Sequence, residues 1–175
     1  MTDRYVVIGN PVAHSKSPWI HAQFARQTGE DIDYGVLHAP LDGFVRAVSE
    51  FRAAGGKGAN VTLPFKQEAF RLAGRVSERA RAAQAVNTLL LEGDGISGDN
   101  TDGFGIVQDL VVNLACVLAG RRVLLMGAGG AAQGVLLPLL EAAPAVLTIA
   151  NRSVDKARAL AARFPGVTAS GYAEL

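Results

Sequence analysis

The sequence predicts an α/β protein made of two domains, an N-terminal α/β domain at residues 1–103 followed by a second α/β domain at residues 104–175. Three observations support this prediction. Strand-like and helix-like segments alternate through the first part of the chain, and from Arg121 the order becomes strand, glycine turn, helix, strand. The 175 residues are 49% hydrophobic and 19% charged, which allows a sizeable core. This length suits one domain or two small ones.

Apolar runs and the residues that end them define the elements of the first half. Tyr5–Ile8 is a short apolar strand. Ser17 followed by Pro18 is typical of a helix start, with serine as the N-cap and proline at the first helical position. Ile20, Phe24 and Ala25 then continue at helical spacing. The later segments are a strand at Asp33–His38, a helix at Leu41–Ala54, a strand at 58–63, helices at Gln67–Ala73 and Ser77–Ala83, and a hairpin pairing Thr88–Glu92 with Ile96–Ser97.

The second half begins with a helix at Phe104–Leu118 and then a continuous apolar strand at Val123–Met126. Such a run is typical of a parallel sheet that is buried on both faces. The next helix opens within glycines and extends to about Ala142, with a kink or an early end expected at Pro138. The last elements are a strand at Val146–Ala150, a helix at Asp155–Arg163 and the beginning of a third strand at Val167–Ala169.

The stretch GANVTLPFK, residues 58–66, ends a strand with polar side chains. Its apolar residues Ala59, Val61 and Leu63 alternate toward a core. Asn60 and Thr62 therefore project from the other face, because strand side chains alternate with a period of two. Lys66 follows at the strand's exit. Two interpretations are open, a solvated lysine beside a polar strand face or a polar ligand site.

The motif GAGGAA comprises Gly127, Ala128, Gly129, Gly130, Ala131 and Ala132 and satisfies G-x-G-x-x-G/A. The first glycine allows a tight turn, the second lets backbone approach a pyrophosphate, and the final small residue lets helix and strand pack closely. Backbone N–H groups at the helix start then face the phosphates. Small residues also occur wherever a helix crosses a strand tightly, but the position between an apolar strand and a helix favours a Rossmann-like, dinucleotide-binding domain.

The end of the following strand indicates which dinucleotide binds. A domain that prefers NAD would place Asp or Glu there, to bind the ribose 2′-hydroxyl. This chain instead has a polar and basic group of residues, namely Asn151, Arg152, Ser153 and Lys156. Because arginine can hold a phosphate with two charge-assisted hydrogen bonds, we expect NADP as the cofactor. The alternative is an exposed arginine beside a helix N-cap at Ser153.

Further polar clusters lie at strand and loop ends of the first half. Ser15 and Ser17 place two hydroxyls beside a helix start, which makes a neutral site for a small carboxylate. The alternative is that Ser17 is merely the N-cap of this helix. Asn87 can both donate and accept hydrogen bonds. Asp102 is flanked by glycines that can bring backbone close to a ligand. The alternative interpretation of this segment is a polar turn with hydrogen bonds from Asp and Asn side chains to the backbone. No metal is expected, since His14, His21 and His38 lack metal-ligand spacing with acidic partners.

Charge and cysteine content exclude several classes of function. The net charge is +1 without a basic run, so we expect no nucleic-acid partner. Glu141 is the one charge between Val123 and Ala150, but the GAGG turn and two prolines favour a buried strand–helix–strand unit over a membrane helix. The single cysteine, Cys116, is expected to be a buried thiol in a reducing compartment, which agrees with a cytoplasmic location.

Six stretches, in this order, resemble the motifs of the shikimate dehydrogenase family: GNPVAHSKSP, GANVTLPFK, AVNT, GDNTDGFG, GAGGAAQG and NRS-x-x-K. They extend from Gly9 to Lys156. The resemblance implies an NADP-dependent oxidoreductase that interconverts 3-dehydroshikimate and shikimate in the shikimate pathway, on the way to chorismate and the aromatic amino acids. It also implies that residues 1–103 bind the substrate and residues 104–175 form part of an NADP-binding Rossmann domain.

The resemblance assigns a role to each matching residue. Ser15 and Ser17 would bind the substrate carboxylate, while Thr62, Asn87 and Asp102 would contact ring hydroxyls with support from Asn60. Lys66 and Asp102 would form the catalytic pair, with Lys66 also contacting substrate. Gly127–Ala132 would hold the pyrophosphate, and the 2′-phosphate would meet Asn151, Arg152, Ser153 and Lys156. Two positions depart from the family pattern: Gln133 replaces an arginine that follows the glycine loop, and Gln84 replaces the glycine that precedes AVNT.

Chains of this family continue well beyond the position of Leu175, so we expect either a fragment or a naturally shortened protein. An unfinished parallel sheet exposes an apolar edge, which favours aggregation or pairing of two chains as a homodimer. We therefore expect little or no turnover from these 175 residues alone. Two alternative functions stay open, a quinate/shikimate dehydrogenase with relaxed specificity and a non-catalytic fragment that binds substrate.

Overall fold

A computed structural model describes residues 2–91 and 93–175 and shows a mixed α/β fold, as the sequence predicts. The described chain forms two compact units. The first comprises residues through Arg81 together with Ala85–Asp99, and the second comprises Ala82–Gln84 together with Asn100–Leu175. The division falls between Asp99 and Asn100, shortly before the boundary expected after residue 103.

The first unit contains a six-stranded sheet in the order β2-β1-β3-β5-β6-β4. Its strands are β1 (Asp3–Gly9), β2 (Ile32–His38), β3 (Gly56–Val61), β4 (Arg75–Val76), β5 (Thr88–Leu90) and β6 (Ser97–Asp99). Strand β1 pairs in parallel with β2 and β3, whereas β3, β5 and β6 pair antiparallel. Strand β4 was not predicted, since two residues are too short for any periodicity to appear in the sequence.

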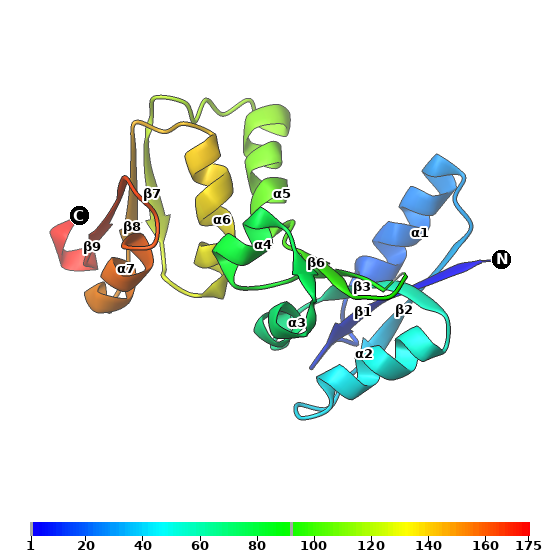
Figure 1. Ribbon diagram of the computed structural model, residues 1–175. Helices are drawn as coiled ribbons and strands as arrows, with labels where there is room; N and C mark the ends of the chain where they lie inside the picture. The colour runs from blue at the N-terminus through cyan, green and yellow to red at the C-terminus, as the bar shows by residue number, and fades with distance from the viewer. Residues whose placement is uncertain (1, 92) are drawn as a thin grey trace. The chain divides into compact units, whose positions relative to one another are not determined.

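Helices cover the two faces of this sheet unequally. The helices are α1 (Ser17–Thr28), α2 (Phe44–Ala53), α3 (Lys66–Leu72) and α4 (Glu78–Ala83). Figure 1 shows α1 on one face of the β1–β3 strands and α2 on the other. The core lies on the α2 side, where Phe44 stacks on Phe65 at 4.9 Å between ring centroids. None of the described residues of α1 is buried, and Trp19 and Phe24 are exposed.

The strand at 58–63 begins and ends earlier than expected. Strand β3 spans Gly56–Val61, and Ala59 and Val61 are buried as predicted. Leu63 is 73% exposed, so its predicted place in the core is wrong. The reason is a turn in which the Phe65 N–H donates to the Thr62 carbonyl, so that the strand alternation no longer applies to Leu63. The end of the predicted strand at Glu92 lies outside the described residues.

The second unit contains a parallel three-stranded sheet in the order β7-β8-β9. Its elements are α5 (Asp102–Gln108), the π-helix η1 (Asp109–Asn113), β7 (Arg122–Met126), α6 (Gly130–Glu141), β8 (Val146–Ala150), α7 (Val154–Ala161), β9 (Val167–Ser170) and the 3₁₀-helix η2 (Tyr172–Glu174). Helix α6 continues through the buried Pro138, so the early end considered there does not occur.

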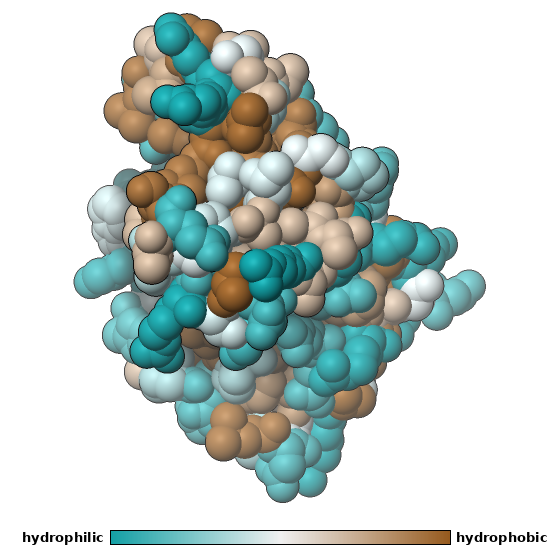
Figure 2. Space-filling view, turned by 90° about the vertical axis from the view of Figure 1, so that its left-hand side faces the viewer, coloured by the Kyte–Doolittle hydropathy of each residue, from teal (hydrophilic) through white to brown (hydrophobic). Residues whose placement is uncertain are grey.

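The predicted helix at Phe104–Leu118 ends at Asn113, and the residues after it are irregular. This corrects the expectation for Cys116, which is exposed rather than buried. Leu114 and Val117 beside it are also exposed, because this segment forms no helical face that could pack against the sheet. Figure 2 shows apolar surface near the top of the view, which is the level of the segment between η1 and β7 in Figure 1.

Strand β7 is buried on one face only, which corrects the expectation that both of its faces would be covered. Val123 and Leu125 point toward the core formed with α6 and α7, whereas Leu124 and Met126 are 47% and 65% exposed. The strand order advances in one direction from β7 to β9, and right-handed crossovers then place both connecting helices on the same face. The opposite face is therefore open in the described part of the chain. Among the described residues, no helix has the length and apolarity that crossing a membrane requires.

Gln84 has a left-handed backbone conformation, with φ at +51°. This conformation costs a residue with a Cβ about 1–2 kcal/mol of conformational free energy, and a glycine at the same position avoids part of that cost. We expect Gln84→Gly to raise the free energy of unfolding by up to about 1 kcal/mol. Urea denaturation measures the change, with Ala22→Gly in α1 as the control, which should destabilise the protein by a similar amount. Equal destabilisation by both variants would contradict the strain.

Candidate functional site

The sheet of the first unit gathers the predicted substrate residues at one edge. Strands β1 and β3 are parallel, so their carboxyl ends lie together. Strand β5 runs antiparallel to β3, with Thr88 opposite Asn60, and β6 runs antiparallel to β5, with Asp99 opposite Thr88. The predicted residues therefore lie at the same edge of the sheet. Ser15 and Ser17 follow β1, Asn60 lies near the end of β3, Thr62 and Lys66 follow β3, and Asn87 directly precedes β5.

The two serines form a hydroxyl pair at the start of α1. The Ser15 hydroxyl donates to the Ser17 hydroxyl over 3.1 Å, and the Ser17 N–H donates back to the Ser15 oxygen over 3.2 Å. Ser17 is thus the first residue of the helix, and the prediction that it is the N-cap is wrong, because Lys16 occupies the cap position. The pair combines hydroxyls with the N–H groups of a helix start, which suits an anion.

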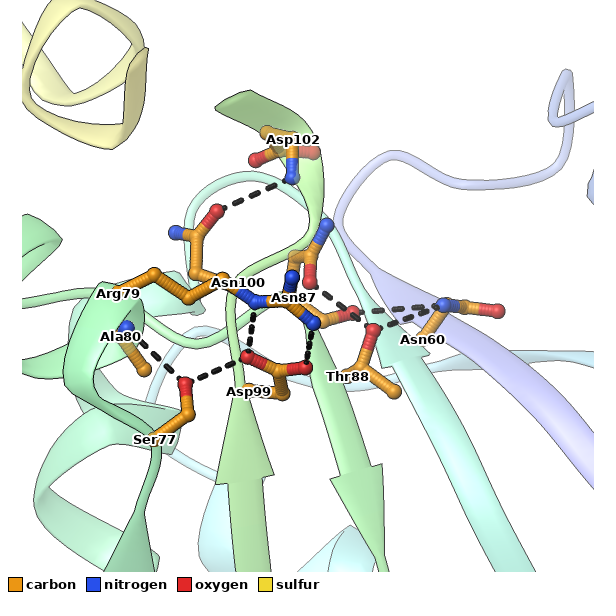
Figure 3. A network of polar contacts seen from close by, with 9 residues as sticks. All are labelled: Asn60, Ser77, Arg79, Ala80, Asn87, Thr88, Asp99, Asn100 and Asp102. Atoms are coloured by element: carbon orange, nitrogen blue, oxygen red, sulfur yellow. Dashed lines mark hydrogen bonds and ion pairs between the residues drawn. The ribbon is translucent and has the colours of Figure 1, made fainter. Parts of the chain in front are cut away.

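Asn60, Thr88 and Asn87 form a continuous set of hydrogen bonds (Figure 3). The Asn60 amide nitrogen lies 3.4 Å from the Thr88 hydroxyl and 3.5 Å from the Asn87 carbonyl. The Thr88 hydroxyl donates to the Asn87 side-chain oxygen over 2.9 Å, and Asn87 is only 8% exposed. These contacts hold the amide of Asn87 in one orientation at the strand edge.

Tyr34, on β2, belongs to the same cluster and was missed by the sequence analysis. Its hydroxyl donates to the Asn60 side-chain oxygen over 2.6 Å. The His21 ring stacks on it, with 4.0 Å between centroids and an interplanar angle of 10°. This stacking gives His21 a structural contact. Among the described residues, no group of three or more His, Cys, Asp or Glu could hold a metal. The signal in the sequence that could have identified Tyr34 was an aromatic ring with a hydroxyl within a predicted strand.

Burial raises the pKa of Tyr34 from its ordinary value of 10.0 to about 12, and a hydrogen bond with the Ser17 side chain offsets this only in part. The unfolded chain therefore releases this proton at a lower pH than the folded protein. The contribution to stability is complete below pH 10 and is lost as the pH rises to about 12. We expect the free energy of unfolding to fall more steeply over this interval in the wild type than in Tyr34→Phe. Urea titrations at successive pH values test this, and equal slopes would contradict it.

Lys66 is the first residue of α3 and is half-buried. Its carbonyl accepts the N–H of Val86 over 2.8 Å, which ties the helix start to the segment that leads into Asn87. The Thr62 N–H donates to the Ile8 carbonyl over 2.9 Å and so fixes the chain between β3 and α3. Backbone hydrogen bonds thus position both residues beside the polar edge.

An ion pair supports this edge from behind. Arg79 binds Asp99 through two nitrogens, and the Ser77 hydroxyl donates to the same carboxylate over 2.5 Å (Figure 3). The Asp99 carbonyl accepts the Asn87 N–H over 2.9 Å. Arg79 and Asp99 therefore brace Asn87, and no local sequence pattern indicated this pairing of residues twenty positions apart.

Asp102 lies in the second unit, where it is exposed and begins α5. Its N–H donates over 3.2 Å to the side chain of Asn100, which is only 3% exposed (Figure 3). The adjacent Gly103 was expected to bring backbone near a ligand. In the structure it lets α5 approach α6, because a Cβ there would overlap the Gly134 carbonyl and lie 2.8 Å from the Val135 Cα.

The glycine loop has the geometry that its motif predicts. Gly127 has φ at +106°, a conformation that favours glycine after β7. A Cβ built at Gly129 or Gly130 would meet nothing within 4 Å, so the space before the first turn of α6 is open. Ala132 is buried in the core of this unit and allows close packing. The loop thus leaves room for a pyrophosphate at a helix start.

The basic residues after β8 lie at the same sheet edge as the loop, since β7 and β8 are parallel with Met126 opposite Ala150. Arg152, Ser153 and Lys156 are exposed, and the Asn151 amide donates to the Ser153 carbonyl over 2.9 Å. Ser153 occupies the N-cap position of α7, yet among the described contacts its side chain makes no capping hydrogen bond. The Gln133 side chain accepts from Arg163 at 3.5 Å.

Comparison with known proteins agrees with both units. Residues 7–89 match the model of the shikimate dehydrogenase substrate binding domain, and residues 109–175 match that of shikimate / quinate 5-dehydrogenase. The shikimate dehydrogenase (NADP(+)) of Aromatoleum aromaticum is 66% identical over 162 residues, which are 93% of this chain and 58% of that protein. The protein of the same name from Chromobacterium violaceum is 60% identical and is matched over 65% of its length.

Solved structures show the same architecture. An Ael1 enzyme from Pseudomonas putida superimposes with a TM-score of 0.95 at 48% identity, covering 98% of this chain and 64% of that one. Shikimate 5-dehydrogenase from Thermus thermophilus, solved with NADP(H) and shikimate, gives a TM-score of 0.87 at 36% identity, covering 95% of this chain and 62% of that one. The chain therefore spans less than two thirds of the length of these relatives.

Fold and site together define a two-unit α/β protein with a Rossmann-like dinucleotide loop in one unit and a polar strand edge in the other. The two family matches account for the chain from residue 7 to residue 175 apart from a short connection. The chain belongs to the shikimate dehydrogenase family.

Proposed function

We propose that the protein carrying this chain is an NADP-dependent oxidoreductase that reversibly reduces 3-dehydroshikimate to shikimate. The observation that carries this proposal is the set of uncharged hydrogen-bonding groups around Lys66 at one sheet edge. A small cyclic acid with several hydroxyls requires such groups. Residues 1–103 act as the substrate-binding domain and residues 104–175 as part of the NADP-binding domain. A cytoplasmic location suits this biosynthetic role.

The substrate residues divide by the chemistry they offer. The hydroxyl pair of Ser15 and Ser17 at the helix start binds the carboxylate without adding charge. Thr62, Asn87 and Asp102 bind ring hydroxyls, and Asn60 orders the amide and hydroxyl groups beside them. A buried amide such as Asn87 selects for a substrate hydroxyl, because an analogue without it would leave the amide unpaired.

Lys66 and Asp102 carry the proton chemistry of the reaction. Lys66 donates a proton to the carbonyl oxygen during reduction and removes it during oxidation. Asp102 accepts a hydrogen bond from a substrate hydroxyl and holds the lysine in position. The carbonyl oxygen gains negative charge during reduction, so a cation beside it stabilises the transition state in either case.

The residues of the second unit fit NADP. The open space at Gly129 and Gly130 admits a pyrophosphate to the start of α6, while Ala128 and Ala131 add no bulk beyond a methyl group. Asn151, Arg152, Ser153 and Lys156 would hold the 2′-phosphate end. When bound, the nicotinamide supplies or accepts the hydride. The exposed Arg152 suits a phosphate better than a ribose hydroxyl.

Two alternatives remain distinguishable by assay. A quinate/shikimate dehydrogenase would use the same residues with relaxed specificity, which the description of the second family model permits. Steady-state rates of the native protein with shikimate or quinate, each with NADP or NAD, separate the two. We expect the highest kcat/KM with shikimate and NADP, and a clear preference for quinate with NAD would overturn the proposal.

The second alternative concerns these 175 residues by themselves, as a non-catalytic fragment that binds substrate. The open face of β7, with Leu124 and Met126 exposed, favours it, since such a surface promotes self-association, including a homodimer. Light scattering of the purified chain, combined with an assay using shikimate and NADP, tests this. Rapid turnover by a monodisperse monomer would exclude the fragment interpretation.

A further inference from the structure

One face of the first sheet carries a row of polar side chains that crosses several strands. In the strand register, Tyr34 lies opposite Tyr5 and Asn60 lies opposite both Val7 and Thr88. Tyr34 and Asn60 therefore belong to the face that α1 covers. Both of them, with Thr88 and His21, line a cavity of about 450 Å³.

Tyr34 connects the two parts of the polar edge. Its hydroxyl donates to the Asn60 oxygen over 2.6 Å. His21 stacks on the tyrosine ring, and its Nδ1 lies 2.9 Å from the Ser17 carbonyl. The helix start that holds the serine pair and the strand that holds Asn60 are thus linked through the Tyr34 phenol and the His21 ring.

The hydrogen bond from Tyr34 determines which way the Asn60 amide faces. With its oxygen held by Tyr34, Asn60 directs its nitrogen toward the Thr88 hydroxyl and the Asn87 carbonyl. The reversed amide would place two oxygens against each other at the Asn87 carbonyl. Since burial raises the pKa of Tyr34 to about 12, the phenol remains a donor throughout the neutral range.

We infer that Tyr34 is a positioning residue for substrate recognition. Its hydroxyl fixes the Asn60 amide, and its stacking on His21 holds the helix start that carries Ser17, so that the groups for the ring hydroxyls and the carboxylate of one substrate are aligned. This inference rests on the proposed function. Tyr34 itself need not touch the substrate, and it takes no part in proton or hydride transfer. It therefore acts on the binding of the cyclic acid and leaves NADP binding unchanged.

Tyr34→Phe in the native protein tests the inference, because it removes the hydroxyl and keeps the ring that stacks on His21. Without this hydroxyl, the Asn60 oxygen lacks its donor, and such a loss is expected to weaken shikimate binding by about 10-fold. We expect the KM for shikimate to rise by about this factor, with kcat and the KM for NADP nearly unchanged. Tyr172→Phe, the same change on an exposed tyrosine of the second unit, is the matched control and should alter neither constant.

A double-mutant cycle identifies the route of the effect. If Tyr34 acts chiefly through Asn60, Tyr34→Phe in an Asn60→Ala background should raise the KM for shikimate no more than about 2-fold further. Full additivity of the two changes, or an unchanged KM in Tyr34→Phe, would overturn the inference while leaving the proposed function intact. Absence of shikimate turnover in the wild type would instead contradict the proposed function.

If the wild type does not turn over shikimate, a measurement that needs no catalysis still tests the positioning role of Tyr34. The side-chain amide protons of Asn60 should exchange with solvent faster in Tyr34→Phe than in the wild type, as followed by nuclear magnetic resonance. Tyr172→Phe should leave this exchange unchanged. Identical Asn60 exchange in the wild type and Tyr34→Phe would overturn the inference independently of any ligand.

Discussion

Replacing Lys66 by alanine is expected to lower kcat for shikimate oxidation by about 10²–10⁴-fold, the usual contribution of a general acid–base group. The KM for shikimate should change far less, because the interaction with the transferring proton develops in the transition state. Steady-state kinetics of the native protein and Lys66→Ala measure both constants. A near-normal kcat would return Lys66 to the interpretation of a solvated lysine at a strand exit.

Two further variants sharpen this test. Lys57→Ala, in the neighbouring strand β3, removes an equal charge from the same unit and should leave kcat within about 3-fold of the wild type. Lys66→Arg keeps the positive charge but cannot release a proton at neutral pH. If Lys66 transfers the proton, arginine will fail to restore the rate. Substantial recovery of kcat would instead assign Lys66 to charge stabilisation.

Arg152→Asp is expected to raise the KM for NADP by at least about 10-fold, because it replaces an attractive charge beside the 2′-phosphate with a repulsive one. The KM for NAD should change much less, so the preference for NADP narrows. Calorimetric titration of NADP into both proteins provides the affinity directly. Unchanged NADP affinity would show that the Arg152 side chain points away from the phosphate.

Arg158→Asp controls for the change in net charge. Arg158 lies on the same helix, α7, and is exposed in a pair with Asp155 at 3.5 Å. Surface charges of this kind contribute little and are screened by salt. An NADP affinity near the wild-type value in Arg158→Asp, together with weakened binding in Arg152→Asp, would assign the effect to one position.

Local pattern was sufficient to predict most elements of the fold. The glycine loop, for example, combines a positive φ at Gly127 with a buried Ala132, as the spacing of small residues requires. Where prediction failed, the expected strand or helix ended early. Leu63 and Cys116 were expected to be buried because apolar residues usually are, but a turn exposes the first and an early helix end exposes the second.

The candidate site shows the same limit. Motif residues such as Ser15 and Asn87 stand out because they interrupt apolar segments near strand ends. The residues that hold them do not, since Tyr34 reaches Asn60 across 26 positions and Arg79 reaches Asp99 across 20. These pairings arise from strand order and register, which no window of neighbouring residues contains. Gly103 likewise owes its role to Gly134, on a different helix.

The most direct test of the site assignment is a crystal structure of the native protein with shikimate and NADPH. Both molecules are in the reduced state, so the complex cannot react. The account predicts the shikimate carboxylate at the Ser15 and Ser17 hydroxyls, a ring oxygen within hydrogen-bonding distance of the Lys66 amine, and the 2′-phosphate at Arg152. Shikimate bound away from the Ser15–Ser17 pair and Lys66, or a 2′-phosphate without contact to Arg152, would contradict it.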